Sequence, residues 1–258
     1  MDRSIVREGI MLTEERHALI LEHVNANKTV SLAQLCELLD TSESTVRRDL
    51  ALLDQNGLLI KVRGGAMALG DRFSLTEQDM AEKSKLFNEE KTAIARFAAQ
   101  LIDEDDFVFI DAGTTTEKMI DFIPQKNVTF VTNAFIHAKK LAQRGFRVLL
   151  PAGEIKLTTE ALVGAECVNS LRNYNFSKCF LGANGISLSG GVSTPDMNEA
   201  SVKSAVISGS REVYLLADHS KFDQTSSVTF ARLNQVRIIT DKLSNKRYFT
   251  AANVKEVL

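Results

Sequence analysis

Three short polar segments, each placed directly after a run of apolar residues, could together bind a small anionic ligand. The segments are "DAGTTT" at 111–116, "TN" at 132–133 and "GANG" at 182–185, which follow "FVFI", "VTFV" and "KCFL". In open parallel sheets, ligands bind outside the carboxyl ends of the strands. Helix N-termini at the same edge attract phosphate through unpaired backbone N–H groups and the helix dipole. These segments therefore predict a phosphate-binding crevice.

Residue types in and around these segments indicate the chemistry of the crevice. Gly113 allows a ligand to approach the backbone closely, and the threonines at 114–116 place hydroxyl groups where a helix begins. Asp111 could accept hydrogen bonds from sugar hydroxyls, or it could simply cap the helix. Lys203 and Lys221 could supply positive charge opposite the loop. Threonine and asparagine also cap helices when no ligand binds, so turn and cap formation is the alternative explanation.

The sequence lacks the usual signals of nucleotide cofactors and metal sites. Neither a G-x-G-x-x-G fingerprint nor a Walker A motif is present. Cys36, Cys167 and Cys179 lie far apart and fit no metal-ligand spacing, which indicates reduced thiols in a cytoplasmic protein. We therefore expect no metal and no bound cofactor.

A second group of polar residues, near the N-terminus, has the side-chain types that recognise DNA. In the helix predicted after Ser42, the apolar Val46, Leu50 and Leu53 share one face. The other side, near the start of the helix, carries Ser44, Thr45, Arg47 and Arg48. Arginine bonds guanine in the major groove, and hydroxyls bind phosphates or base edges. The alternative is a solvated helix face whose arginines are balanced by nearby aspartates such as Asp49.

Two further helices are predicted before the helix that contains these arginines. Thr13 is a good N-cap for the first, which extends to about Asn25, and Ser31 can cap the second. One face of the second helix is expected to contain Leu32, Leu35, Leu38 and Leu39. Gly57 is expected to end the third helix.

A β-hairpin is predicted after the third helix. The segments "LLIKV" and "AMAL" flank Gly64 and Gly65, a favoured pair for a two-residue turn. Lys61 and Arg63 on this hairpin would contact the neighbouring DNA backbone. Three helices followed by a hairpin predict a winged helix-turn-helix.

The rest of the chain alternates between helices and short apolar runs such as "FVFI", "VTFV" and "VYLLAD". This alternation predicts a parallel sheet covered on both faces, which is an α/β fold of the Rossmann-like type. We divide the chain into a disordered extension (1–10, with Met11 as a candidate start), a winged helix-turn-helix domain (11–70), a linker running into a helix (71–88), an effector domain (89–245) and a C-terminal tail (246–258).

Bulk properties fit a soluble protein and give no direct sign of nucleic acid binding. The 258 residues suffice for two domains, and 44% of them are apolar while 25% are charged. Residues 1–70 contain 8 Lys/Arg against 10 Asp/Glu, so any DNA contact depends on local placement of charge. No apolar run approaches the roughly 18 residues of a membrane span, and the N-terminus lacks a secretory signal. We expect a cytoplasmic protein.

The N-terminal residues resemble DeoR-type bacterial repressors. The shared pattern includes Arg16, Ile20 and Val24, then Ser42, Thr45, Val46, Arg47, Arg48, Asp49 and Leu50, and it continues into the wing "GLLIKVRGGA". This pattern is long and fixed in its spacing. The resemblance implies that the residues facing operator DNA are Ser42, Ser44, Thr45, Arg47 and Arg48.

The C-terminal half resembles the effector domain of the same family. The similarity is found in "DAGTTT", "VTN", "TEALVG", "FLGANGIS", "EASVK" and "ADHSKF", so that it covers about 11–245 in all. That domain is similar to sugar-phosphate isomerases of the ribose-phosphate isomerase and glucosamine-phosphate deaminase kind. The resemblance implies a phosphorylated sugar as effector, bound by Asp111, Gly113, Thr114, Thr115, Thr116, Thr132, Asn133, Asn184, Lys203 and Lys221.

Within the family, the chain is most similar to fructose-operon repressors, which respond to fructose 1-phosphate. Its "TEALVG" segment is shared with lactose-operon repressors that sense tagatose 6-phosphate, so Glu160 is expected to contact a ketose phosphate. Pro151 and Ala152 replace two glycines found in many members, and His219 stands where a small residue is common. We expect these departures to change the loop contacts and the shape of the pocket.

Two classes of protein compete: a ligand-gated repressor, and a sugar-phosphate isomerase or deaminase with an accessory DNA-binding module. Isomerisation needs a positioned general base. Asp111 and Glu160 are candidates, but the sequence shows no partner that would orient either one. His17, His23 and His137 look like helix-surface residues, and a winged helix has no purpose in an isomerase. We therefore predict a homodimeric or homotetrameric repressor that releases double-stranded operator DNA when a sugar phosphate binds.

Overall fold

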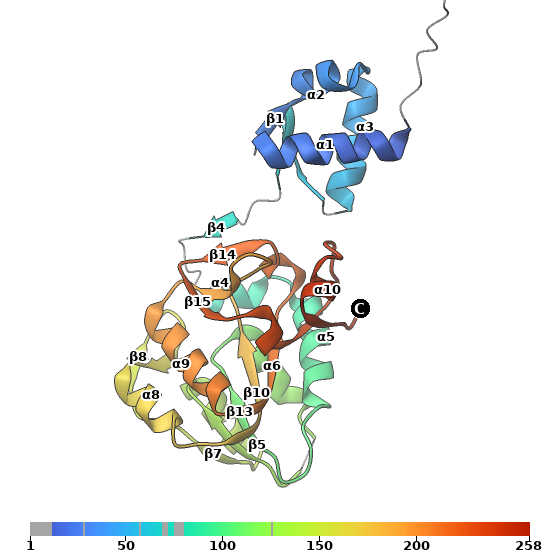
Figure 1. Ribbon diagram of the computed structural model, residues 1–258. Coiled ribbons are helices and arrows are strands. Elements are labelled where there is room, and N and C mark those ends of the chain that lie inside the picture. The colour runs from blue at the N-terminus through green and yellow to red at the C-terminus, as the bar shows by residue number, and fades with distance from the viewer. Residues whose placement is uncertain (1–11, 28, 57, 69–71, 75–79, 125) are drawn as a thin grey trace, which may run out of the picture. The chain divides into compact units, whose positions relative to one another are not determined.

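The computed structural model describes residues 12–27, 29–56, 58–68, 72–74, 80–124 and 126–258 (Figure 1). The predicted extension at 1–10, Met11 and the predicted helix end at Gly57 lie outside these residues. The chain divides after residue 70 into two compact units. None of the helices in the described segments has the length and apolar character that a membrane span requires.

The N-terminal unit consists of three helices and a small antiparallel sheet. The elements are α1 (Thr13–Asn27), β1 (Thr29–Ser31), α2 (Leu32–Leu39), α3 (Glu43–Gln55), β2 (Ile60–Val62) and β3 (Gly65–Met67). Ser31 begins α2 with a capping box, because its hydroxyl accepts from the Gln34 N–H and the Gln34 side chain accepts from the Ser31 N–H. Ser42 begins α3 by accepting from the Thr45 N–H.

The sheet of this unit has a third strand that the sequence did not reveal. Both β1 and β2 pair with β3, in the order β1-β3-β2. Glycine is required at 65 because a Cβ there would lie 2.1 Å from the Val30 carbonyl oxygen. Gly64 has a φ of 93°, a conformation that glycine adopts without strain. The predicted hairpin is therefore present and is joined to the segment between α1 and α2, but the prediction of its turn is wrong by one residue: Gly65 pairs with Val62, so the two turn residues are Arg63 and Gly64.

One face of each helix forms the core of the N-terminal unit. The buried side chains include Ile20, Leu35, Val46, Leu50 and Leu53, and the last three occupy the α3 positions predicted from helical spacing. The prediction for Leu38 is wrong, because 43% of this residue is exposed. Adjacent residues lie about 100° apart around a helix, so Leu38 points well away from the buried Leu39.

A partly buried ion pair joins α1 to α3. Arg16 Nε lies 2.6 Å from Asp49 Oδ2, and His17 Nε2 lies 3.0 Å from Asp49 Oδ1. Asp49 therefore does not balance the arginines of α3, because it faces α1 instead. Burial alone would raise the pKa of Asp49, but the hydrogen bonds from Arg16 and His17 outweigh burial and lower this pKa below its usual value.

We predict that Asp49→Asn destabilises the N-terminal unit by about 1.5–3 kcal/mol, because it removes the charged hydrogen bonds that the buried Asp49 accepts. Hydrogen–deuterium exchange of the α1 and α3 amides in the full chain measures this effect. Because the folded-state pKa of Asp49 is lowered, its stabilisation is complete above about pH 4 and is lost as the pH falls further.

The control for this prediction is Glu43→Gln, which breaks the exposed pair between Glu43 and Arg47 on the surface of α3. This substitution should change stability by less than about 0.5 kcal/mol, since exposed i,i+4 pairs contribute little. Equal protection changes in the two variants would contradict the role given to Asp49.

A seven-stranded parallel sheet forms the centre of the C-terminal unit. Its strands are β5 (Phe107–Ile110), β6 (Thr129–Thr132), β7 (Arg147–Leu149), β10 (Phe176–Gly182), β13 (Ser210–Leu216), β16 (Arg237–Thr240) and β17 (Asn253–Glu256). Their spatial order is β17-β16-β13-β10-β5-β6-β7, with all neighbours parallel. From β5 the chain adds β6 and β7 on one side and then crosses to β10 on the other. The topological switch point, where ligands bind in such folds, therefore lies between β5 and β10.

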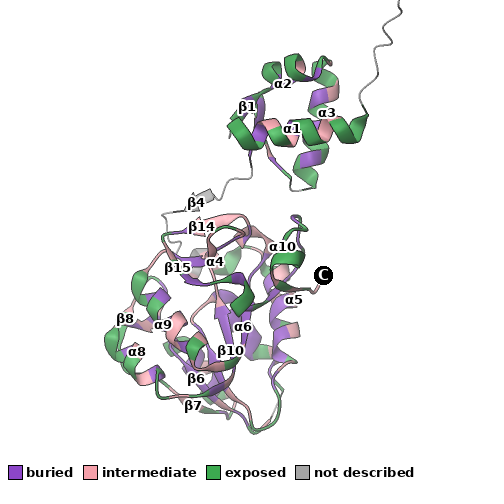
Figure 2. Cartoon of the chain, viewed as in Figure 1, coloured by how far each residue is buried: buried purple, intermediate pink, exposed green. Residues whose placement is uncertain are grey.

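Alternate residues of the strands face two separate cores. Phe109 belongs to a core with α8 (Ala165–Leu171) and α9 (Met197–Ser208). Val108 and Ile110 belong to a core with α5 (Asn88–Ala99), α6 (Thr114–Phe122) and α7 (Phe135–Gln143). The sheet is thus buried on both faces (Figure 2), which confirms the α/β fold predicted from the apolar runs.

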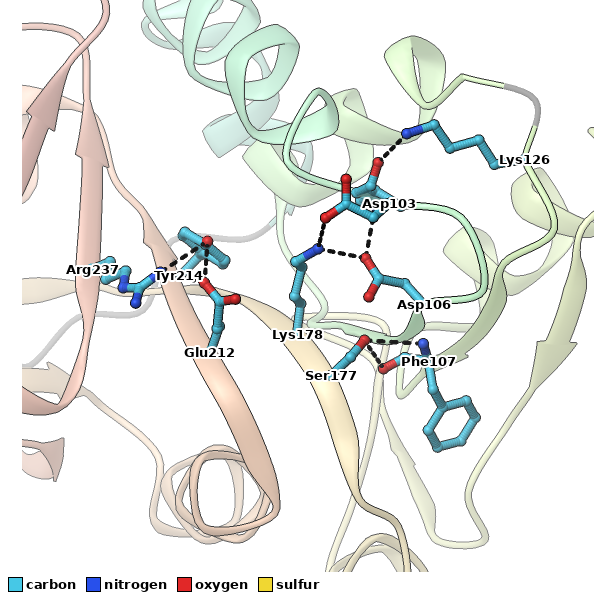
Figure 3. A network of polar contacts seen from close by, with 10 residues as sticks. Asp103, Asp106, Phe107, Lys126, Ser177, Lys178, Glu212, Tyr214 and Arg237 are labelled. Atoms are coloured by element: carbon cyan, nitrogen blue, oxygen red, sulfur yellow. Dashed lines mark hydrogen bonds and ion pairs between the residues drawn. The ribbon is translucent and has the colours of Figure 1, made fainter.

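Polar contacts join the amino ends of β5 and β10, at the end of the strands opposite the switch-point crevice. Lys178 Nζ lies 2.5 Å from an Asp103 carboxylate oxygen and 2.7 Å from an Asp106 carboxylate oxygen (Figure 3). Ser177 Oγ accepts from the Phe107 N–H at 3.0 Å and donates to the Phe107 carbonyl at 3.2 Å. These groups satisfy one another, so we assign the cluster to sheet stability.

Smaller sheets and short helices complete the C-terminal unit. The strands are β8 (Glu154–Lys156) with β9 (Ala161–Val163), β11 (Gly185–Ser187) with β12 (Gly191–Thr194) and β15 (Val228–Ala231), and β14 (Gln224–Ser226) with β4 (Arg72–Ser74). The short helices are α4 (Met80–Lys85), η1 (His219–Lys221), η2 (Leu233–Gln235) and α10 (Tyr248–Ala251). Of these elements, α4, η1 and the turn of the β8–β9 hairpin supply residues to the crevice at the switch point.

Two predicted boundaries need correction. Residues 246–258 are not a tail, because β17 pairs in parallel with β16 as the last strand of the large sheet. Residues 71–88 are more than a linker running into a helix, because β4 pairs with β14 before the helix α4 begins. These elements are short, and their partners are distant in the sequence. Local patterns do not show such pairing.

Candidate functional site

The N-terminal end of α3 presents a cluster of hydroxyl groups. Ser42 Oγ lies 2.9 Å from Ser44 Oγ and 3.0 Å from Thr45 Oγ1, and both serines are exposed. The Ser42 hydroxyl also accepts from the Thr45 N–H, so it caps the helix and orients its neighbours. Ser44 and Thr45 are therefore placed to donate to phosphate or base acceptors.

Two exposed arginines follow this cluster on α3. Arg47 Nη2 lies 3.2 Å from the carboxylate of Glu43, in an exposed pair that is weak in water. Arg48 is exposed, and no carboxylate of the described residues lies within ion-pair distance of it. Arg48 is therefore the α3 arginine whose guanidinium is most available to a guanine base.

The wing adds two cations beside α3. Lys61 and Arg63 are both exposed, and the alternation of strand residues places them on the same face. The Lys61 N–H donates to Asp54 Oδ1 at 3.0 Å, which ties β2 to the end of α3. The predicted DNA-binding residues of this unit thus lie on two elements that are linked to each other.

The crevice of the C-terminal unit lies at the carboxyl ends of β5, β10 and β13. Its lining includes Met80, Lys83, Lys91, Ala112, Gly113, Thr114, Thr115, Thr116, Thr159, Gly182, Ala183, Asn184, Glu199, Lys203, Leu216, Ala217, Asp218 and Lys221. The structure therefore brings together seven of the predicted effector residues: Gly113, Thr114, Thr115, Thr116, Asn184, Lys203 and Lys221. The other four are Asp111, Thr132, Asn133 and Glu160, which lie outside this lining.

Asp111 lies beneath the crevice and is paired with Lys203. Its Oδ2 atom contacts Lys203 Nζ and accepts from the Gly182 N–H at 2.9 Å, and only 2% of the residue is exposed. Burial raises the pKa of Asp111, against the opposing charge of Lys203. An uncompensated carboxylate beside a phosphate site would repel the ligand. Here Lys203 compensates the negative charge of Asp111.

The threonine loop divides into residues that support it and residues that face the crevice. Thr116 is fully buried, and its hydroxyl donates to the Asp111 carbonyl at 2.7 Å and to the Gly113 carbonyl at 2.9 Å. Thr114 and Thr115 begin α6 after Gly113, and no side-chain cap is present at this helix N-terminus. The helix dipole and the first N–H groups of α6 are therefore directed toward a ligand in the crevice.

Thr132 and Asn133 support the crevice from behind. Asn133 Oδ1 accepts from the Ala112 N–H at 3.1 Å, and its Nδ2 donates to the Leu162 carbonyl at 3.3 Å. Thr132 Oγ1 accepts from the Ala134 N–H at 3.1 Å. Both side chains are buried, so they position the end of β6 and the β5–α6 loop.

Lys91 lines the crevice, although the sequence analysis did not select it. It is 4% exposed, and its Nζ donates to the Lys83 carbonyl. Burial lowers the pKa of Lys91 to about 8, a shift that Asp218 opposes and Lys221 reinforces. A signal did exist in the sequence. Ile94 and Ala95 follow Lys91 by three and four residues, so helical spacing places all three on the same face of α5, which is the buried one.

Glu199 is a second lining residue that the sequence analysis missed. Its carboxylate accepts from Thr159 Oγ1 at 2.6 Å and lies 3.1 Å from Lys156 Nζ. Burial alone would raise the pKa of Glu199, but Lys203, Thr159 and Lys156 outweigh burial and lower it. A lowered pKa makes Glu199 a weak base near neutral pH. The sequence did contain a signal for Glu199: it precedes Lys203 by four residues, and this spacing places both side chains on the same face of α9.

The η1 turn positions Lys221 and Asp218 at the crevice. Asp241 accepts from the His219 N–H at 2.7 Å and lies 2.6 Å from His219 Nδ1. Together with Glu90 these two side chains form the one group of the described residues with possible metal-ligand spacing. Because both Asp241 oxygens already bind His219, we assign the group to holding η1 in place.

The prediction that His137 lies on a helix surface is wrong. The residue is 1% exposed and contacts the backbone of Asp111 and Gly113 from beneath the loop. Burial lowers the pKa of His137 to about 3, so it is neutral at physiological pH. His17 also has a structural partner, since it binds Asp49.

Neither general base considered from the sequence is placed to act in the crevice. Asp111 is buried against Lys203, and Glu160 lies outside the lining with a φ of 53°. The crevice instead combines cationic side chains with the N-terminus of a helix. This arrangement favours binding of an anion over proton transfer.

Comparisons with known families and proteins agree with the two-unit organisation. Residues 16–71 match the DeoR-like helix-turn-helix domain, and residues 87–242 match the DeoR C-terminal sensor domain. The chain is similar to the uncharacterized HTH-type transcriptional regulator FruR of Bacillus subtilis (strain 168), with 40% identity over 89% of this chain and 91% of the relative.

Further relatives have names of the same kind. The HTH-type transcriptional repressor GlcR of Bacillus subtilis (strain 168) is 32% identical over 92% of each chain. The lactose phosphotransferase system repressor of Staphylococcus aureus (strain N315) is 35% identical over 89% of this chain and 92% of the relative. These names confirm the prediction of a regulator over an enzyme.

Similarity to solved structures is weaker. Ribose 5-phosphate isomerase A of Methanocaldococcus jannaschii gives a TM-score of 0.40 with 15% identity, over 52% of this chain and 54% of that chain. The eIF2B delta structure from Chaetomium thermophilum gives a TM-score of 0.40 with 20% identity, over 83% of this chain and 66% of that chain. The two matched domains and the nearly full-length relatives show that this chain belongs to the DeoR family of helix-turn-helix transcriptional regulators.

Proposed function

We propose that this chain represses a sugar-utilisation operon and releases its operator when a phosphorylated sugar occupies the crevice. The effector proposed is fructose 1-phosphate, with no further cofactor. A homodimer or homotetramer is the proposed active form, since a symmetric protein matches an operator with repeated half-sites. The proposed location is the cytoplasm, where operator DNA and sugar phosphates are both present.

The DNA-binding part of the proposal is supported by the placement of charge on α3 and the wing. The N-terminal unit has no excess of basic residues, but Arg48, Lys61 and Arg63 are all exposed. Arg48 is proposed to contact a base, with Ser44 and Thr45 on phosphate or base edges. Lys61 and Arg63 are proposed to bind the flanking backbone, a contact that positions the protein without reading sequence.

The sugar phosphate part of the proposal depends on one observation, the concentration of lysines around the N-terminus of α6. Lys83, Lys91, Lys203 and Lys221 all line the same crevice. Lys203 is neutralised by Asp111, whereas Lys91 is buried with a carbonyl partner and a lowered pKa. A dianionic phosphate would compensate this excess of positive charge. Glu199, Asp218 and Asn184 offer acceptors for the hydroxyls of a sugar.

The choice of fructose is supported by similarity. One relative is named FruR and another is named as a lactose phosphotransferase system repressor. The turn of the β8–β9 hairpin belongs to the "TEALVG" segment, and its Thr159 lines the crevice. We therefore keep Glu160, the next residue, as a proposed contact that requires movement of this turn.

A thermal-shift panel of hexose and ketose phosphates tests the proposed effector. A ligand present at 100 times its dissociation constant stabilises a protein by about 2.7 kcal/mol. Fructose 1-phosphate should raise the unfolding temperature more than fructose 6-phosphate, tagatose 6-phosphate or free fructose. If no sugar phosphate in the panel stabilises the protein, the proposed effector class is wrong.

We predict that Arg48→Ala weakens operator binding by about 1–3 kcal/mol, because it removes a contact to a base. Fluorescence anisotropy of a labelled operator fragment measures this change, and sugar phosphate affinity should stay the same. Arg172→Ala, which removes an exposed arginine of the C-terminal unit, is the matched control. Normal operator binding by Arg48→Ala would refute the assignment of α3 as the base-reading helix.

We predict that Thr115→Glu abolishes the response to sugar phosphate while operator affinity remains intact. The new carboxylate would occupy the crevice at the N-terminus of α6, where it repels a phosphate. The same anisotropy assay, with increasing fructose 1-phosphate, measures the response. Thr115→Ser should respond like the wild type, and a Thr115→Glu protein that still releases DNA would place the ligand elsewhere.

We predict that sugar phosphate affinity falls by up to about tenfold per pH unit between pH 8 and pH 10. Lys91 loses its proton in this range when the crevice is empty, because its pKa is lowered to about 8. A bound phosphate favours the charged lysine, so binding takes up a proton above pH 8. Calorimetric titration in buffers of different ionisation enthalpy measures this uptake.

Two variants separate Lys91 from other titrating groups. Lys91→Met should bind more weakly and lose most of the pH dependence, whereas Lys242→Met, at an exposed position outside the crevice, should behave like the wild type. The phosphate itself is dianionic well above a pKa of about 6, so it does not contribute. If the affinity of Lys91→Met for sugar phosphate still falls with pH as in the wild type, the proton uptake belongs to another group.

A further inference from the structure

Two lysines from successive helices lie together on one side of the crevice. Lys83 belongs to α4 and Lys91 to α5, and both line the crevice. Lys91 is 4% exposed, and its Nζ donates to the Lys83 carbonyl. Among the described residues, no carboxylate lies within ion-pair distance of this ammonium. A buried ammonium is stable when it is paired with an anion, so this position favours a negatively charged ligand.

Like charges oppose the contact between α4 and α5. Three other lysines repel the ammonium of Lys91 and lower its pKa, namely Lys83, Lys118 and Lys221. Asp218 opposes this repulsion. Lys83 therefore acts on Lys91 in two opposite ways, because its carbonyl accepts from the ammonium that its side chain repels.

The turn between α4 and α5 adds backbone strain at Phe87. This residue has a φ of 53° and a ψ of 45°, which is the left-handed conformation that bulky residues rarely adopt. Its ring packs edge-on against His219, with 5.0 Å between the ring centroids, and its carbonyl accepts from the Lys91 N–H at 3.0 Å. Strained residues of this kind persist where surrounding contacts hold them, and they cluster in ligand clamps and switch regions.

A dianionic phosphate in the crevice changes this balance in favour of the contact. An ammonium has three N–H donors, so Lys91 can bind a phosphate oxygen and the Lys83 carbonyl at the same time. The phosphate also compensates the repulsion between the two lysine side chains. Both effects hold α4 against α5 more firmly, and an uncharged sugar supplies neither of them.

We propose that α4 closes on the phosphate group of the bound ligand, with Lys83 on one side of the Phe87 turn and Lys91 on the other. The ligand thus stabilises a helix of six residues that is weakly held without it. Because α4 belongs to the segment that follows the helix-turn-helix unit, closure carries the effect of the ligand to that segment. Closure rests on the proposed function, since it requires a phosphorylated ligand in the crevice.

Hydrogen–deuterium exchange of the full chain tests closure at the amides of residues 84–87. Saturating fructose 1-phosphate should slow the exchange of these amides at least about fivefold, the lower end of typical coupling between sites. Inorganic phosphate should slow the exchange as well, because it supplies the same anion, whereas free fructose should not change it. Titration calorimetry on the same samples measures whether each compound binds.

Variants on the two sides of the turn should change α4 in opposite directions. Lys91→Met removes the donor, so without ligand the amides of residues 84–87 should exchange about tenfold faster, as expected for the loss of a charged hydrogen bond. Fructose 1-phosphate should then protect them less. Lys83→Gln keeps the backbone carbonyl but removes a repelling charge, so without ligand these amides should exchange about twofold more slowly than in the wild type.

The sign of the Lys83→Gln effect separates closure from a purely structural role of Lys83, which would predict faster exchange. Lys85→Gln is the matched control, because Lys85 is an exposed lysine of α4 outside the crevice lining, and it should behave like the wild type. Unchanged exchange of the β5 and β10 amides shows that each variant is folded.

Closure is refuted if fructose 1-phosphate binds but leaves the exchange of α4 unchanged or makes it faster. It is also refuted if Lys91→Met and Lys83→Gln change this exchange in the same direction. If neither fructose 1-phosphate nor inorganic phosphate binds in calorimetry, the proposed function itself is wrong, and closure fails with it.

Discussion

The buried contact between Lys203 and Asp111 is the interaction on which the crevice depends. Asp111 follows β5 and Lys203 lies on α9, so the pair spans the switch point of the sheet. Without Lys203, a buried carboxylate would face the proposed phosphate site, and without Asp111 the lysine would be a buried unpaired charge. Removing one partner of such a pair costs far more than the pair contributes. The contact therefore fixes α9, and with it Glu199, above the strand ends.

Local patterns in the sequence were enough to predict the main architecture and the centre of the crevice. The apolar runs indicated the parallel sheet, and the polar segments after them indicated the switch-point edge, where the structure brings together Gly113, Thr115 and Asn184. The same patterns could not distinguish residues that line the crevice from residues that hold its loops in place. Asn133 has the same residue type as Asn184, but its amide bonds Ala112 and Leu162 behind the loop.

The features that the sequence analysis missed depend on contacts between distant segments. Lys91 follows two glutamates and looks like a surface residue, yet α5 packs on the sheet so that this position is buried. His137 also looks like a surface residue, because two lysines follow it closely in the sequence, but it is buried beneath the β5–α6 loop. β17 was taken for a tail because four residues with few apolar side chains give a weak strand signal. Its structure comes from pairing with β16.

The crevice lining includes residues through which a bound ligand would affect other segments of the chain. A ligand shifts an equilibrium only through contacts that differ between two states. Met80 and Lys83 of α4 line the crevice, and α4 belongs to the segment that leads from the N-terminal unit into the C-terminal one. Thr159, at the turn of the β8–β9 hairpin, lines it as well and binds Glu199. The N-terminal unit has a core of its own, so it does not depend on the ligand for folding. A ligand that contacts Met80 or Lys83 would therefore act on the segment that follows a separately folded helix-turn-helix unit.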